Sequence, residues 1–225
     1  MTTPTHNIGI YDWVPEFARG FVRDLRVRWT LEEIGEGYTT DAVDVRAKPP
    51  TLTAKQPFGQ VPWYDDGAVE MFESGAICLW VAQQSGKLIG ASPDDHAKAI
   101  SWTFAALNSI EPVTQQLGAI ELFHKGESWT EARRPQVLEF LDKRIGALEA
   151  HLAGRDWLGD DFSVGDILMA SVLRDIPVDD YLDRFPVTKA YRDRCLGRPA
   201  FARALAAQMG DFKAIDAAPP EPAAA

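Results

Sequence analysis

The chain has 225 residues, of which 46% are hydrophobic and 25% charged, and this composition is typical of a globular protein with one large domain or two small ones. Its formal net charge is −10, and it carries no basic stripe of the kind that nucleic-acid binders use, so that class is disfavoured. No apolar run approaches the ~20 residues that span a membrane, and the first residues lack the apolar core of a signal peptide.

The first half of the chain alternates strands and helices. Residues 7–13 are rich in β-formers and predict a strand, and Phe21, Leu25 and Trp29 share one face of a predicted helix over residues 21–34. Residues 38–45 alternate as a second strand, and a short irregular helix is expected between Thr51 and Lys55. With the hairpin that follows, the order βαβαββα predicts a thioredoxin-like domain with a mixed sheet.

A hairpin and the start of a helix follow at residues 61–83. Residues 61–64 and 69–71 predict its two strands, and the turn Asp65-Asp66-Gly67 suits the positive φ that tight hairpins need. Pro62 cannot donate to a sheet ladder and should lie at the start or edge of its strand. A cis bond between Val61 and Pro62 would leave the Val61 main chain free to pair with something other than a strand.

Glu73 and Ser74 stand where the next helix begins. Free N–H groups and the helix dipole attract a carboxylate there, and the Glu73 side chain attracts an ammonium group. This corner therefore offers partners to both ends of a zwitterionic amino acid. An ordinary hairpin with a capped helix explains the turn and Ser74, but it does not explain the Val-Pro and Glu-Ser pairs together at this spacing.

The second half of the chain reads as helical. After a linker at residues 85–93, helices are predicted at residues 94–123, bent at Pro112, and at 131–152. Ser163 and Asp166 form a capping box at the start of an apolar helix, for which we expect a folding role worth about 1 kcal/mol. Residues 191–196 and 199–209 close an all-helical domain over residues 94–213, and residues 214–225 read as a disordered tail.

Residues 57–62, the acidic-Gly turn, and the sequence Glu-Ser-x-Ala-Ile at 73–77 resemble the glutathione-binding half of the cytosolic glutathione transferases. The capping box and residues 197–204 resemble the helical domain of the same family, so the resemblance covers nearly the whole chain. It implies a thioredoxin-like domain at residues 1–84 and an all-helical substrate and dimer domain at 94–213.

The resemblance also implies the roles of individual residues. The main chain of Val61, before Pro62, would pair with the cysteinyl part of glutathione, and Glu73 and Ser74 would hold its γ-glutamyl part. Gln60 would contact the γ-glutamyl or cysteinyl backbone. A basic residue would hold the glycyl carboxylate, for which Lys55 is a candidate and Lys48 an equal contender.

Three candidates remain for the group that stabilises the thiolate of glutathione. Family members use a Tyr at the end of strand one or a Ser or Cys before helix one, but residues 13–28 contain no Ser, Thr, Cys or Tyr. Tyr11 carries the remaining hydroxyl at this end of the strand and is a candidate donor to the thiolate. It could equally be a residue that packs its ring beneath the helix. Arg19 is a second candidate, and the main-chain N–H groups of residues 20–22 are a third.

The resemblance places an electrophile pocket between the domains, lined by aromatic side chains, although such residues more often belong to a core. The candidates are Trp13, Phe17, Trp102 and Phe104. It further implies a homodimer, a small hydrophobic electrophile as substrate, and a role in detoxification.

Cysteine and histidine spacing argues against two other classes. Cys78 and Cys195 form no CxxC pair, so a disulfide framework and a thioredoxin-type dithiol are disfavoured and a cytoplasmic location is expected. The four His residues show no metal-binding spacing, so we expect no metal. A glutathione-dependent reductase would need a Cys before helix one, and Cys78 lies in a later helix.

The sequence therefore predicts a glutathione S-transferase that conjugates glutathione to an electrophile or uses it to reduce a peroxide. The alternative is a non-catalytic module on the same scaffold that binds glutathione, another ligand or a partner, and the missing Ser favours this alternative.

Overall fold

The computed structural model describes residues 6–217 and groups them into two units. The thioredoxin-like unit contains residues 6–85 and 199–217 of the described chain, and the helical unit contains residues 86–198.

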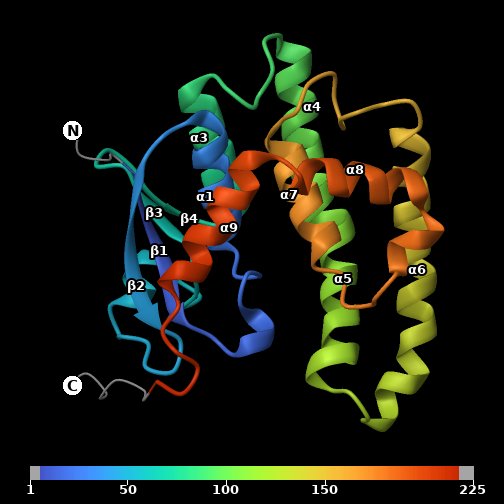
Figure 1. The fold of residues 1–225 in the computed structure, drawn as a ribbon, viewed down its shortest axis with the longest axis horizontal. Helices are drawn as coiled ribbons and strands as arrows, with labels where there is room; N and C mark the ends of the chain where they lie inside the picture. The colour runs from blue at the N-terminus through green and yellow to red at the C-terminus, as the bar shows by residue number, and fades with distance from the viewer. Residues whose placement is uncertain (1–5, 218–225) are drawn as a thin grey trace. The chain divides into compact units, whose positions relative to one another are not determined.

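The thioredoxin-like unit is built on a four-stranded mixed sheet in the order β2-β1-β3-β4 (Figure 1). Strand β1 pairs with β2 in parallel and with β3 antiparallel, and β3 and β4 form an antiparallel hairpin. The order βαβαββα and the thioredoxin-like fold are therefore as predicted. The elements are β1 (His6–Trp13), α1 (Asp24–Ile34), β2 (Tyr38–Asp44), α2 (Leu52–Lys55), β3 (Trp63–Asp65), β4 (Glu70–Phe72) and α3 (Ser74–Ser85).

Successive side chains of β1 point to opposite faces of the sheet. Ile8 and Ile10 are buried on one face. Gly9 and Tyr11 belong to the other face, where a Cβ atom on Gly9 would lie 1.9 Å from the ring of Trp63. Glycine is thus required there because the Trp63 ring covers the main chain. Tyr11 packs on the same cluster, which contains Val43, Leu52, Val61 and Trp63.

Helix α1 begins at Asp24, three residues later than the hydrophobic pattern predicts. The chain between β1 and α1 instead forms a 3₁₀ turn, η1 (Glu16–Ala18), and then passes through Gly20 with φ of 80°. A left-handed residue interrupts helical geometry, so residues 21–23 remain in a turn. The result is a long loop directly after the strand that carries Tyr11.

The last helix, α9 (Pro199–Asp211), packs against α1 and belongs to the thioredoxin-like unit (Figure 1). The sequence places residues 199–213 in the helical domain, and the structural grouping differs from that expectation. A buried polar network joins the two helices, since Arg28 contacts Asp24 at 2.7 Å and Asp211 at 2.6 Å and Gln208 donates to Asp24 at 2.8 Å. The contacts of Arg28 with Asp211 and of Gln208 with Asp24 are long-range, which explains why local sequence patterns did not reveal them.

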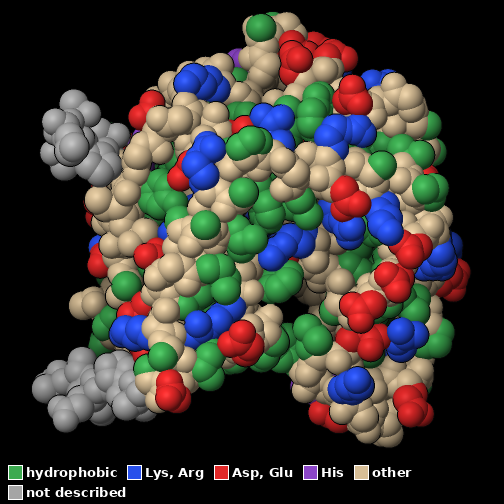
Figure 2. Space-filling model, in the orientation of Figure 1, with side chains coloured by type: hydrophobic (Ala, Val, Ile, Leu, Met, Phe, Trp, Pro, Cys, Tyr) green, Lys and Arg blue, Asp and Glu red, His purple; other side chains and the backbone are tan. Residues whose placement is uncertain are grey.

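The helical unit contains α4 (Pro93–Phe104), α5 (Glu111–Gly118), α6 (Ser128–Leu152), α7 (Val164–Arg174), η4 (Tyr181–Arg184) and α8 (Pro186–Leu196). The single helix expected at residues 94–123 is interrupted by two π-helical segments, η2 (Ala105–Ile110) and η3 (Ala119–Phe123). Pro112 occupies the first turn of α5, directly after the π-helical segment η2. Acidic and basic side chains alternate on the face shown in Figure 2.

Helix α7 is buried from Val164 to Leu173 and begins at the expected capping box. Asp166 accepts hydrogen bonds from the Ser163 N–H at 2.8 Å and the Ser163 hydroxyl at 3.0 Å. A second capping box, formed by Ser92 and Asp95, starts α4. The linker is tied to α7, because the Val164 N–H donates to the Leu88 carbonyl at 2.8 Å.

Candidate functional site

The turn at residues 56–60 is organised by the buried side chain of Gln56. Its Oε1 accepts hydrogen bonds from the N–H groups of Phe58 at 2.7 Å and Gln60 at 3.3 Å, and Gly59 takes a positive φ of 62°. Gln56 thus determines how Gln60 and the following residues leave the turn. Sequence reasoning assigned no role to Gln56, although it is the first residue of the motif.

Val61, directly after this turn, has main-chain polar groups that are available to a ligand. The Val61–Pro62 bond is cis, and β3 begins one residue later, so Pro62 precedes its strand as the sequence predicts. The Val61 side chain is buried in the cluster beneath Tyr11. Among residues 6–217, no hydrogen bond involves the N–H or C=O of Val61.

The hairpin brings Glu73 and Ser74 to the same end as Val61. Trp63 pairs with Phe72, so the residues before β3 and after β4 emerge side by side. The Glu73 side chain is exposed, whereas Ser74 is buried as the first residue of α3. Its hydroxyl accepts a long hydrogen bond of 3.5 Å from Arg26. The corner thus presents an outward carboxylate beside a helix N-terminus.

The backbone of Glu73 is strained. Its φ is 72°, a left-handed conformation that residues with a Cβ atom rarely adopt. Residues in such conformations cluster at ligand-binding positions, where the surrounding structure holds them. The strain therefore points to a functional role for the Glu73 carboxylate, which the hairpin and α3 hold outward.

Tyr11 lies next to the turn that precedes Val61. Its hydroxyl donates to the Gly59 carbonyl at 3.4 Å, and the Lys48 ammonium donates to the same carbonyl at 2.9 Å. The Lys48 nitrogen also lies 5.6 Å from the centre of the Tyr11 ring. The structure thus brings Tyr11 and Lys48 together with the main chain of residues 59–61. Lys55 instead pairs with Asp41 at 3.2 Å.

The remaining candidates fall into two groups. Trp13 is the last residue of β1, and the Arg46 guanidinium stacks 3.8 Å from its ring centre. Phe17 and Arg19 belong to the loop after β1, where Phe17 is 55% exposed. Trp102 and Phe104 belong to the helical unit, where Phe104 is 52% exposed and the Trp102 ring lies 4.5 Å from His151. The first group belongs to the thioredoxin-like unit and the second to the helical unit, and their role in binding an electrophile stays a prediction.

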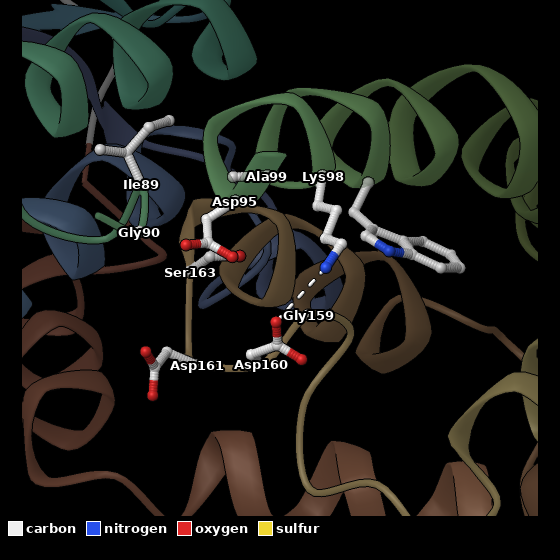
Figure 3. A pocket seen from close by; sticks show the side chains of 10 residues that line it. Ile89, Gly90, Asp95, Lys98, Ala99, Gly159, Asp160, Asp161 and Ser163 are labelled. Atoms are coloured by element: carbon white, nitrogen blue, oxygen red, sulfur yellow. Dashed lines mark hydrogen bonds and ion pairs between the residues drawn. The ribbon is translucent and has the colours of Figure 1, made fainter. Parts of the chain in front are cut away.

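A small cavity of about 20 Å³ lies in the helical unit between the loop before α4 and the segment before α7 (Figure 3). Trp102 lines it, and Lys98 crosses it to Asp160 at 3.3 Å. A space of this size admits about one water molecule. It is therefore a packing feature of the capping-box region and not a site for an organic substrate.

Both cysteine thiols are buried and are expected to be unreactive in the native protein. Burial raises the pKa of Cys78 to about 12 and raises that of Cys195 as well. At about pH 8 both should remain protonated, and only thiolates are good nucleophiles. We expect no labelling by iodoacetamide in native buffer and labelling of both cysteines in denaturant, read by intact mass. Rapid native labelling of either thiol would contradict this.

In the part of the chain that the structure describes, no group of three or more His, Cys, Asp or Glu side chains could hold a metal ion. Within residues 6–217, no helix is long and apolar enough to cross a membrane.

Comparison with known proteins identifies the class. The sequence profile of the glutathione S-transferase N-terminal domain matches residues 17–83, which include the turn, Val61, Glu73 and Ser74. Glutathione S-transferase F9 of Arabidopsis thaliana is 31% identical over 182 residues, covering 76% of this chain and 81% of the relative. The chain therefore belongs to the glutathione S-transferase superfamily.

Solved structures of bacterial glutathione transferases share the fold. The enzyme from Pseudomonas putida, crystallised with glutathione disulfide, matches with a TM-score of 0.78 and 24% identity over 88% of this chain and 90% of its own. The enzyme from Burkholderia graminis, crystallised with two glutathione molecules per subunit, matches with a TM-score of 0.78 and 25% identity over 88% and 87% of the two chains.

Proposed function

We propose that this protein binds glutathione at the end of the β3–β4 hairpin and activates its thiol for attack on a small hydrophobic electrophile. The observation that carries the proposal is the corner where the free main chain of Val61 meets the outward carboxylate of Glu73 and the start of α3. Relatives that carry the glutathione S-transferase name and bacterial structures crystallised with glutathione support it.

Each part of glutathione has a complementary group in this proposal. The cysteinyl main chain pairs with the N–H and C=O of Val61, with Gln60 beside it. The γ-glutamyl ammonium contacts Glu73, and its carboxylate contacts Ser74 and the first N–H groups of α3, where the helix dipole favours an anion. The glycyl carboxylate is left for Lys55 or Lys48, which lie on the α2 side of the turn.

The chemical step requires a thiolate. An ordinary thiol has a pKa of about 8.5, and lowering it by two units needs about 2.7 kcal/mol of stabilisation of the anion. In this proposal a hydroxyl hydrogen bond to the sulfur supplies part of this stabilisation, and Tyr11, whose hydroxyl now donates to the Gly59 carbonyl over a long 3.4 Å, gives it by turning toward the ligand. The thiolate then forms a carbon–sulfur bond as the leaving group departs with its electron pair.

The partners follow from the exposed apolar side chains of each unit. In the thioredoxin-like unit, Phe58 is 70% exposed and contacts Phe72, next to a cavity of about 200 Å³ that includes Trp63 and Met71. We assign this surface to a second copy of the chain in a homodimer. Trp13, Phe17, Trp102 and Phe104 are the proposed aromatic contacts of the electrophile, and a cytoplasmic detoxifying role remains a prediction.

Replacing Tyr11 by Phe tests the chemistry. We expect kcat for conjugation of a chloronitrobenzene to fall about tenfold to a hundredfold near neutral pH, because the thiolate loses a hydrogen bond from a well-placed hydroxyl. The glutathione Kd, measured by calorimetry, should stay within about twofold, since Tyr11 contributes no contact to the peptide main chain. The pH profile of kcat should shift upward, because a less stabilised thiolate has a higher pKa.

The same measurements separate the proposal from its alternative. Unchanged turnover in Tyr11→Phe would refute the role of Tyr11 and leave Arg19 or the main-chain N–H groups of residues 20–22 as donors. Glutathione binding by the wild type without any conjugation would favour a binding module. No glutathione binding would refute the proposal as a whole.

A further inference from the structure

The segment after α9, residues 212–217, is held against the last residues of β1 and the loop that follows, together residues 12–19; we call this segment the C-terminal strap. Lys213 makes three contacts with this loop. Its N–H donates to the Asp12 carbonyl at 2.7 Å, its ammonium pairs with the Asp12 carboxylate at 2.7 Å, and its carbonyl accepts a hydrogen bond from the Arg19 guanidinium. Lys213 therefore joins the two ends of the loop formed by residues 12–19.

Two further carbonyls of the strap are also held. The Trp13 indole N–H donates to the Ile215 carbonyl at 3.2 Å, and Arg46 donates to the Ala217 carbonyl at 2.8 Å. Arg46 in turn stacks on Trp13 and forms an ion pair with Asp44 at 2.6 Å. Residues 214–217, expected from composition to belong to a disordered tail, are thus fastened to the loops after β1 and β2. Residues 218–225 lie outside the described part of the chain.

The loop depends on the strap for its polar contacts. Among the buried side-chain atoms of the described residues, Asp12 Oδ1 and Arg19 Nε have no hydrogen-bond partner. The Asp12 carboxylate pairs with the Lys213 ammonium through Oδ2. The Arg19 guanidinium binds the Lys213 carbonyl, lies 5.2 Å from the centre of the Phe212 ring and forms a longer ion pair with Glu16 at 3.9 Å. Removing the strap would take away the cation that pairs with Asp12 and the carbonyl that Arg19 binds, so the loop would lose the contacts that join its two ends.

Residues 12–19 directly follow Tyr11. They include Arg19, a candidate to stabilise the thiolate, and Trp13 and Phe17, candidates to line the electrophile pocket. Within the described residues, Val61, Glu73 and Ser74 form no hydrogen bond or ion pair with the strap. The strap and the corner at the hairpin end therefore touch different parts of the proposed site.

We propose that Lys213 is a positioning residue, and that the C-terminal strap holds the loop of residues 12–19 in the conformation that the reaction of the glutathione thiol requires. This inference rests on the proposed function. It separates two steps: the hairpin corner sets the affinity for glutathione, and the strap sets the rate at which bound glutathione reacts.

Two truncations form a matched pair for the test. A chain ending at Asp211 keeps α9 and lacks the strap, whereas a chain ending at Ala217 keeps both and lacks only the residues after the strap. Lys213→Ala and Lys213→Arg supply the point variants, which remain informative if the shorter chain folds poorly. The measurements are hydrogen exchange of residues 12–19, glutathione Kd by calorimetry, and kcat as a function of pH.

Without the strap, the amides of residues 12–19 should exchange faster, and kcat should fall about tenfold or more because misplaced groups lose much of their effect. Glutathione Kd should stay within about twofold. Lys213→Ala, which removes the ammonium and keeps the main-chain contacts, should change exchange and kcat in the same direction by a smaller amount. Lys213→Arg, which also keeps a cation at this position, should recover most of kcat. The chain ending at Ala217 should match the full chain.

Equal exchange of residues 12–19 in the two truncations would show that the strap does not hold the loop and would overturn the inference. Faster exchange with an unchanged kcat would overturn the positioning role of Lys213. A full-length chain that binds no glutathione would refute the proposed function instead, and the exchange comparison would still decide whether the strap holds the loop.

Discussion

Replacing Asp166 by Ala is expected to lower the free energy of unfolding of the helical unit by about 3–5 kcal/mol. The carboxylate is fully buried and accepts four hydrogen bonds. Besides the two from Ser163, Oδ1 accepts the Leu158 N–H at 2.9 Å and the Tyr191 hydroxyl at 2.9 Å. Alanine would leave these donors buried without partners, and each such group costs about 1–3 kcal/mol.

Asp95 provides the matched control, because it occupies the same position of the other capping box. It accepts the Ser92 N–H at 3.1 Å and the Ser92 hydroxyl at 2.7 Å, but it is partly exposed, so water replaces these bonds when the side chain is removed. We expect Asp95→Ala to cost about 1 kcal/mol, the usual value for a cap.

Denaturant unfolding followed by circular dichroism measures both variants. Tyr191→Phe, which removes one of the four hydrogen bonds of Asp166 and keeps the ring, should cost about 1 kcal/mol. Equal losses for Asp166→Ala and Asp95→Ala would show that Asp166 acts only as a helix cap, and that its contacts with Leu158 and Tyr191 contribute nothing.

The second large effect is expected at Glu73, where stability and binding should change in opposite directions. Glu73→Gly removes the carboxylate proposed to hold the γ-glutamyl ammonium, and hydrogen bonds to charged groups contribute about 1.5–3 kcal/mol. Glutathione Kd should therefore rise about tenfold to a hundredfold. The protein itself should become more stable by about 0.5–1 kcal/mol, because relief of about 1–2 kcal/mol of left-handed strain exceeds the entropy cost of glycine.

Calorimetry with glutathione and denaturant unfolding give the two quantities. Glu73→Gln removes the charge and keeps the strained backbone, so it should weaken binding without the gain in stability. Glu70→Gln, which removes an exposed charge three residues earlier on β4, controls for net charge and should change neither. Unaltered glutathione affinity in Glu73→Gln would exclude an ion pair with the ligand.

Local patterns predicted most elements because they depend on side-chain periodicity and turn chemistry. The order of strands and helices, the hairpin turn at Gly67 and the position of Pro62 before β3 all follow from residues close in sequence. The predicted helix boundaries are wrong where distant contacts or unusual backbone geometry determine where a helix begins or how it continues. Helix α1 starts late because Gly20 is left-handed, and the helix expected at residues 94–123 contains two π-helical segments that no periodicity indicated.

The candidate site shows the same division. The residues at its centre, Val61, Glu73 and Ser74, could be proposed from sequence because the motif is local. Gln56 was missed, since its role depends on two main-chain hydrogen bonds that only the folded turn creates. The partners of Tyr11 also come from folding, because Gly59 and Lys48 reach its hydroxyl and ring from other segments.

By itself, the sequence determined the class of this protein, the order of its elements and the residues around which glutathione binding is proposed. Its patterns of hydrophobic periodicity, turns and caps act over a few residues and can be read from them directly. Only the tertiary structure decided that α9 packs on α1, that the Asp166 cap lies at the centre of a core, and that Lys213 fastens the loop after β1. Those contacts join residues far apart in the chain, and their strength comes from burial, which no local pattern records.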